Sequence, residues 1–203
     1  LGLGLGNDGY SPMITSLAAG TSNLFVSGYF KTAGGVPATN LARWDGSQWH
    51  SLDNVSTADN SFIATRGDDL FVCEYNHSNL RVRRWQSGAW TQVGADILLA
   101  NASYIPPSMV WAGTNLYVAG NFIVTNDFFA TNLLGWNGTI WAGVSHPFGA
   151  DKLISPVTTD GTNLFVAINS DNAAVTEVTL AKWNGNQWMI LGTGTTSERP
   201  WVK

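Results

Sequence analysis

Short runs of β-branched and aromatic residues, bounded by Gly, Asn and Asp, recur along the whole chain. Four of them share one form, an Asn or Asp followed by three apolar residues: Asn23–Val26, Asp69–Val72, Asn115–Val118 and Asn163–Val166. No stretch of ten or more residues has apolar positions at the three- and four-residue spacing of an amphipathic helix. Runs of this composition have strong β propensity. The pattern therefore predicts an all-β protein.

Tryptophans occur in pairs five residues apart, and each pair encloses a turn sequence. The pairs are Trp44/Trp49, Trp85/Trp90, Trp136/Trp141 and Trp183/Trp188. Three of them enclose Asp-Gly or Asn-Gly, and the second encloses Ser-Gly. Such steps supply the positive φ of a tight hairpin, so each pair is predicted to bracket a turn between two antiparallel strands. The eight indoles are predicted to fill the gaps between neighbouring units as core residues; the alternative is a platform on which sugars stack.

The strands form a repeat. A weaker apolar stretch precedes each of the four runs and another strand follows each Trp pair, which makes four short strands in about 47 residues. The repeats cover approximately residues 7–53, 54–94, 95–146 and 147–194. Four strands at this period are typical of a blade of a β-propeller. The sequence thus predicts one β-propeller module over residues 1–203, with four four-stranded antiparallel blades.

The two ends of the chain carry matching sequences. Leu3–Gly6 followed by Met13–Thr15 matches Leu191–Gly194 followed by Trp201–Lys203, at an offset of 188 residues or four units of 47. Residues 1–6 and 195–203 are therefore predicted to be partial-blade strands. A surplus strand that completes a blade in a neighbouring copy would propagate head to tail. The candidate inter-subunit strands consist of Leu1, Gly2, Leu3, Gly4, Leu5, Gly6, Trp201, Val202 and Lys203.

The repeat resembles the extracellular kelch and galactose-oxidase-like group of β-propeller repeats. The motif L-Y-V-x-G-x-F with W-(D/N)-G-x-x-W-x-x-L-G is matched by Leu24–Phe30 with Trp44–Trp49, and again by Leu116–Phe122 with Trp136–Trp141. The second and fourth repeats depart from it, with Glu74 and Ile168 in place of a glycine. The resemblance implies a non-enzymatic binding or assembly module that is extracellular or lies at the cell surface.

Composition excludes several classes of protein. Only 12% of residues are charged and 44% are hydrophobic, whereas disordered chains have high charge and low hydrophobicity. The apolar runs are far too short to cross a bilayer, so no membrane span is predicted. The net charge is −4 and no basic cluster is longer than Arg81–Arg84, so nucleic acid is not an expected partner. Cys73 is the single cysteine, which forbids an internal disulfide and is predicted to be a small buried hydrophobic residue.

No residue pattern indicates catalysis, a metal site or a cofactor. His50, His77 and His146 lack the spacing of metal-binding pairs, and no calcium loop, phosphate loop or nucleophile elbow occurs. Most carboxylates fall in predicted turns, and nothing selects a catalytic pair. We therefore expect no enzyme activity and no cofactor. Four N-glycosylation sequons occur, one at a hairpin tip and three in predicted loops: Asn137, and Asn54, Asn76 and Asn101.

Three functions follow as expectations. The first is a secreted, non-enzymatic structural or surface protein that assembles head to tail into extracellular filaments by strand exchange, with itself or other surface proteins as partners. The second is a carbohydrate-binding lectin with sites between or upon blades. The third is an adhesion or scaffold segment of a larger surface protein.

Overall fold

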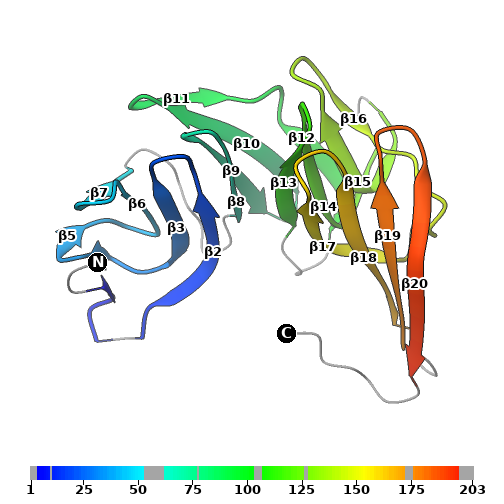
Figure 1. The fold of residues 1–203 in the computed structure, drawn as a ribbon, viewed down its shortest axis with the longest axis horizontal. Helices are drawn as coiled ribbons and strands as arrows, with labels where there is room; N and C mark the ends of the chain where they lie inside the picture. Colours follow the sequence, from blue (N-terminus) through cyan, green and yellow to red (C-terminus); the bar gives the residue numbers. More distant parts are fainter. Residues whose placement is uncertain are drawn as a thin grey trace. The chain divides into compact units, whose positions relative to one another are not determined.

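The computed structural model describes residues 4–9, 11–52, 62–76, 78–102, 107–125, 128–171 and 176–196 (Figure 1). Every regular element in these ranges is a β-strand, which confirms the predicted all-β class. In the part of the chain so described, no helix is long and apolar enough to span a membrane. The chain divides into two compact units, Leu1–Ile97 and Leu98–Lys203, and each is described by itself.

The first unit contains two sets of four antiparallel strands, one for each of the first two repeats; the first set is a sheet of its own and the second belongs to a larger sheet. The first set has the order β2 (Met13–Ala19), β3 (Leu24–Tyr29), β6 (Leu41–Trp44) and β7 (Trp49–Ser51). The second has the order β8 (Phe62–Arg66), β9 (Asp69–Asn76), β10 (Asn79–Gln86) and β11 (Ala89–Gln92). A small third sheet is formed by β1 (Leu5–Gly6), β4 (Thr32–Ala33) and β5 (Val36–Pro37).

The second unit repeats this arrangement. The third repeat forms β13 (Ser108–Ala112), β14 (Asn115–Val124), β15 (Ala130–Trp136) and β16 (Trp141–Gly143). The far end of β14 also pairs with β12 (Ile97–Ala102). The fourth repeat forms β17 (Leu153–Thr159), β18 (Leu164–Asp171), β19 (Thr176–Trp183) and β20 (Trp188–Thr196). β20 extends two residues beyond the expected end of this repeat at residue 194. Each repeat is thus a four-stranded antiparallel meander in chain order.

Each Trp pair brackets a hairpin turn, as the sequence predicts. The two indoles of every pair lie directly opposite each other in adjacent strands. The glycine of each turn has φ between 88° and 99°, a conformation that residues with a Cβ atom rarely adopt. In three of the turns a side-chain oxygen accepts hydrogen bonds from the backbone N–H groups two and three residues further on; the residues are Asp45, Asn137 and Asn184. Local turn chemistry therefore sets the strand register.

Hydrophobic side chains of successive repeats share a core within each unit. The first and second repeats share Phe25, Leu41, Leu52, Ile63, Leu70 and Val72. The third and fourth repeats share Ala112, Tyr117, Ala119, Leu133, Ile154, Leu164, Val166, Ile168 and Ala181. Leu41 and Leu133 hold the same position of the repeat, so the two junctions are built alike. Full burial of one such leucine contributes about 1.5–3 kcal/mol.

The same positions of the fourth repeat are exposed. Leu180 and Leu191 correspond to Leu133 and Val144 of the third repeat. Leu133 is fully buried and Val144 packs against the shared core, whereas Leu180 is 51% and Leu191 49% exposed. The burial of a repeat position thus depends on whether another sheet packs on that face of the strand.

Two asparagines at equivalent positions form side-chain hydrogen bonds to the backbone of an earlier segment. Asn40 and Asn132 have φ of 62° and 63°, a left-handed conformation that Asn tolerates better than most residues. Each side-chain oxygen accepts a hydrogen bond from the backbone N–H of the phenylalanine ten residues earlier. Asn132 is fully buried and also donates to the carbonyls of Ala150 and Lys152, which precede β17. This side chain therefore ties the third repeat to the start of the fourth.

Candidate functional site

A pocket of about 260 Å³ opens in the second unit, between the third and fourth repeats. Its walls come from the start of β14, from the β15–β16 hairpin and from the turn between β19 and β20. The residues that matter most for its chemistry are Asn115, Tyr117, Gly135, Trp136, Ser145 and Trp183. No described residue that lines it is charged. The pocket therefore combines aromatic walls with neutral polar groups.

The aromatic walls are held in place by their neighbours. Trp136 packs on Trp141 with ring centroids 5.4 Å apart, and Trp183 packs on Trp188 at 5.2 Å. The indole N–H of Trp188 donates a 2.9 Å hydrogen bond to the carbonyl of Ser145. Because Trp188 belongs to the fourth repeat and Ser145 to the third, this bond fixes the two walls relative to each other within the unit.

Polar residues also line the pocket. Asn115 Nδ2 donates a 3.3 Å hydrogen bond to the Tyr117 hydroxyl. The ring of Tyr117 is buried in the shared core, with 5% of the residue exposed. Asn137 lies in the β15–β16 turn, where its Oδ1 accepts hydrogen bonds from the backbone N–H groups of Thr139 and Ile140. Amide and hydroxyl groups are thus presented in fixed positions.

One of the residues that line the pocket is a glycine, at position 135. Gly135 lies directly opposite Tyr117 in the β14–β15 pair. A Cβ added there would lie 3.2 Å from Val144 Cγ2 and 3.5 Å from Tyr117 Cε1. A side chain at this position would therefore lie against Val144 and Tyr117, which both line the pocket.

The other three repeats carry a long cationic side chain at this position: Arg43, Arg84 and Lys182. In the first repeat the Arg43 guanidinium lies 5.4 Å from the centre of the Trp85 ring, and its Nη1 donates a 2.9 Å hydrogen bond to Asn23 Oδ1. Trp85 belongs to the next repeat, as Trp183 does at the pocket. Arginine therefore fills in the first unit the space that Gly135 leaves open in the second.

The second and fourth repeats also stack the cation on an aromatic ring. The Arg84 guanidinium lies 6.0 Å from the centre of the Phe71 ring and is hydrogen-bonded to Asp69. Lys182 Nζ lies 5.7 Å from the centre of the Phe165 ring. The third repeat differs twice, because it has a glycine in place of the cation and a tyrosine in place of the phenylalanine.

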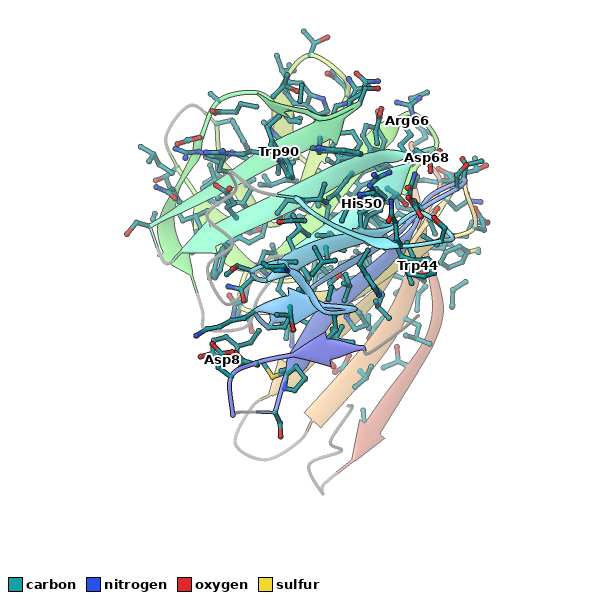
Figure 2. The ribbon with its side chains drawn as sticks, turned by 90° about the vertical axis from the view of Figure 1, so that its left-hand side faces the viewer. Asp8, Trp44, His50, Arg66, Asp68 and Trp90 are labelled. Carbon is teal, nitrogen blue, oxygen red and sulfur yellow. The ribbon has the colours of Figure 1, made fainter. Side chains whose placement is uncertain are left out.

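The eight paired tryptophans differ in burial. Trp49 and Trp141 are 9% and 8% exposed, and the other six are partly exposed. Trp44 and Trp90, both labelled in Figure 2, lie on β6 and β11 of the first unit. Trp136 and Trp183 line the pocket. Positions that look identical in the sequence thus differ in burial, and for the partly exposed members the core and platform interpretations both stay predictions.

The sequons are placed only in part. Asn137 is exposed at a hairpin tip, as expected. Asn76 ends β9 and Asn101 lies in β12, so their expected location in loops is wrong; these polar residues sit near strand ends, where the loop signal and the strand overlap. Asn54 lies outside the described residues.

The N-terminal candidate strand pairs within its own chain. Leu5 and Gly6 lie opposite Ala33 and Thr32, and Leu5 packs against a cluster that contains Val26 and Trp49. Gly4 precedes this strand, while Leu1, Gly2 and Leu3 lie outside the described residues, as do Trp201, Val202 and Lys203. Strand exchange between copies therefore stays a prediction.

None of the described residues considered for chemistry lines the pocket. Cys73 is fully buried, as predicted, and burial raises the pKa of its thiol far above the usual range. His50 (Figure 2) contacts the carboxylate of Asp45, whose pKa is lowered chiefly by the backbone N–H of Gln48 and then by His50. His146 contacts two backbone carbonyls, and His77 lies outside the described residues. Within the described ranges no three His, Cys, Asp or Glu residues are grouped as a metal site.

Sequence reasoning missed the pocket, although one signal for it was present. The residue before the first Trp of each pair is cationic in three repeats and glycine in the third. Aligning the repeats would have singled out Gly135. Only the structure shows that the cations of the first two repeats contact aromatic rings and hydrogen-bond acceptors.

Comparison with known proteins finds likeness in fold alone. No family model matches the chain, and no curated protein does. Two solved structures of mutant Aleuria aurantia lectin, one in complex with α-methyl-L-fucoside and the other with Fucα1-6GlcNAc, are each 14% identical with a TM-score of 0.52. The two alignments cover 87% and 91% of this chain, and this chain spans only 58% and 62% of the length of the two lectin chains. A GH32 β-fructofuranosidase of Bombyx mori, also 14% identical, matches 95% of this chain and 36% of its own at a TM-score of 0.40.

Proposed function

We propose that this chain is a non-enzymatic carbohydrate-binding protein, a β-propeller of four blades that binds one sugar ring in the pocket at Gly135. The observation that carries the proposal is the replacement of a space-filling cation by glycine in one repeat of four. The replacement opens a cavity between Tyr117, Trp136 and Trp183. Loss of a stacked side chain has no packing benefit, so a ligand that takes its place is the better explanation.

The chemistry of the walls suits a sugar. A pyranose has one face of C–H groups, which pack on an aromatic ring, and an edge of hydroxyls, which need donors and acceptors. Trp136 and Trp183 supply the rings, and Asn115, the Tyr117 hydroxyl and Ser145 supply polar partners. The volume of about 260 Å³ lies near the lower end, roughly 300 Å³, of ligand pockets, which favours a single ring.

The fold comparison supports the same proposal. The two lectin structures with the TM-score of 0.52 are complexes with fucosides, so α-methyl-L-fucoside is one ligand to try first. Their 14% identity gives no correspondence of binding residues. The proposal for this chain therefore depends on the pocket itself.

The test fills the pocket in the way that the first repeat does. G135R places an arginine where Arg43 stands in the first repeat. The matched control is G192R, because Gly192 lies on β20 of the same unit with no atom within 4 Å of an added Cβ. Binding of monosaccharides and α-methyl-L-fucoside is followed by tryptophan fluorescence and calorimetry.

We expect at least one sugar to bind wild-type protein and G192R equally, and G135R to lose that binding. Two results would overturn the proposal. One is that G135R binds as well as wild type. The other is that every sugar binds wild type more weakly than about 10 mM, which corresponds to less than roughly 3 kcal/mol of binding free energy.

A further inference from the structure

The cations of the other repeats indicate what the pocket accepts. Arg43 makes two contacts at the junction of the first and second repeats: its guanidinium lies over the Trp85 ring, and its Nη1 donates to Asn23 Oδ1. It also lies directly opposite Phe25 across the strand pair. The contacts of the Arg43 side chain therefore show which groups a bound cation could contact at the equivalent place in the second unit.

Each partner of Arg43 has a counterpart in the pocket. Asn115 takes the place of Asn23, Tyr117 that of Phe25, and Trp183 that of Trp85. The register is also the same, because Gly135 lies opposite Tyr117 as Arg43 lies opposite Phe25. What differs is the cation, which is missing from the third repeat.

We propose that the pocket selects a sugar that carries a protonated amine, so that the ammonium group occupies the position of the Arg43 guanidinium. The ligand class is an amino sugar; the inference rests on the proposed function in taking a sugar as the ligand, and adds the charge. The amine lies against the face of Trp183 and donates to the amide oxygen of Asn115, whose nitrogen is directed to the Tyr117 hydroxyl.

The electrostatics of the pocket favour this ligand. The face of an aromatic ring is negative and attracts cations, most strongly when the ring is tryptophan. The described lining holds no positive side chain that would repel an ammonium group. The chain as a whole has a net charge of −4, which adds a weak long-range attraction. One stacked cation is worth roughly a 2- to 30-fold difference in affinity, depending on how far it is desolvated.

The experiment compares sugars that share one ring and differ in the group at C2, which is charged in one of them and neutral in the others. Glucosamine carries the ammonium group, whereas glucose and N-acetylglucosamine have the same ring without it. Methylguanidinium carries the cation without a sugar. Each is titrated against wild-type protein, G135R and the control G192R at one pH and ionic strength.

A second variant tests the acceptor. N115D introduces the carboxylate that the second repeat has at this position, where Asp69 binds Arg84. Because an ionised acceptor strengthens a hydrogen bond to a cation, N115D should bind glucosamine more tightly than wild type does, and its preference for glucosamine over glucose should rise about 3- to 10-fold. The second repeat already accommodates an aspartate there, so the strand is expected to fold.

The results separate this inference from the function on which it rests. The charge preference is supported if glucosamine binds more tightly than both neutral sugars, if G135R loses this binding and if N115D strengthens it. Equal binding of all three sugars overturns the charge preference and leaves sugar binding in place. Binding of methylguanidinium without any sugar overturns the proposed function and leaves the cation site. If no ligand binds wild type, both fall.

Discussion

Two equivalent leucines of the second unit give a direct measure of how much the packing between repeats contributes to stability. Leu133 and Leu180 hold the same position of the third and fourth repeats, on β15 and β19. Leu133 is fully buried against Ile154, Leu164 and other residues of the fourth repeat, whereas Leu180 is 51% exposed. L133A and L180A make the same chemical change in two surroundings.

The two costs follow from burial. Leu133→Ala removes fully buried carbons and leaves a cavity in the shared core, which costs about 2–5 kcal/mol. Leu180→Ala removes a side chain that is half exposed and leaves no enclosed cavity, so it should lower the free energy of unfolding by about 1 kcal/mol. The difference in strand propensity between Leu and Ala is common to both variants. We therefore expect L133A to cost at least twice as much as L180A.

Urea unfolding followed by tryptophan fluorescence measures both free energies. Both residues belong to the unit Leu98–Lys203, so the comparison holds even if the two units unfold separately. An L180A variant as destabilised as L133A would refute the reasoning, because Leu180 would then be covered in solution. Repeating the measurement at several protein concentrations would show whether a second copy covers it.

Two further predictions concern buried polar groups and pH. Asn132→Ala removes three hydrogen bonds and places alanine at a φ of 63°, so it should cost roughly 3 kcal/mol in urea unfolding. Asn40→Ala, at the equivalent partly exposed position, should cost less; an equal cost would contradict this account. Backbone N–H groups, that of Asn163 foremost, lower the pKa of Asp160 to about 2 from an ordinary value of 3.8. Its stabilising effect is therefore complete above pH 3.8 and is lost as the pH falls through about 2, so the Tm difference between wild type and D160N should shrink over that window and stay constant above it.

The parts of the fold that follow from local chemistry were predictable from the sequence. The Asp-Gly and Asn-Gly steps fix the hairpins, and the strands on either side follow from β propensity. The burial of the indoles was not predictable in this way. Trp49 and Trp90 occupy the same position of the motif, yet one is buried and the other partly exposed. The difference depends on which side chains pack on each hairpin, and that is information from distant parts of the chain.

The candidate site was harder to predict for a related reason. Catalytic and metal sites are recognisable in a sequence by their reactive side chains, whereas this candidate site depends on a missing side chain. Gly135 carries no signal until it is compared with Arg43, Arg84 and Lys182, and the meaning of those cations depends on the rings and acceptors that they contact. The left-handed Asn132 was missed as well, because its role depends on carbonyls 18 and 20 residues away.

The comparison between repeats also separates a functional glycine from a structural one. Glycine inside a strand weakens it, by up to about 1 kcal/mol, and the third repeat lacks the stacked cation, worth roughly 0.5–1 kcal/mol. If Gly135 is present for a ligand, G135K should raise the free energy of unfolding by about 1 kcal/mol while abolishing binding. If Gly135 is present because Val144 leaves no room, the close contact of 3.2 Å to an added Cβ makes the same variant less stable. Urea unfolding therefore distinguishes the two explanations by the sign of the change, before any ligand is known.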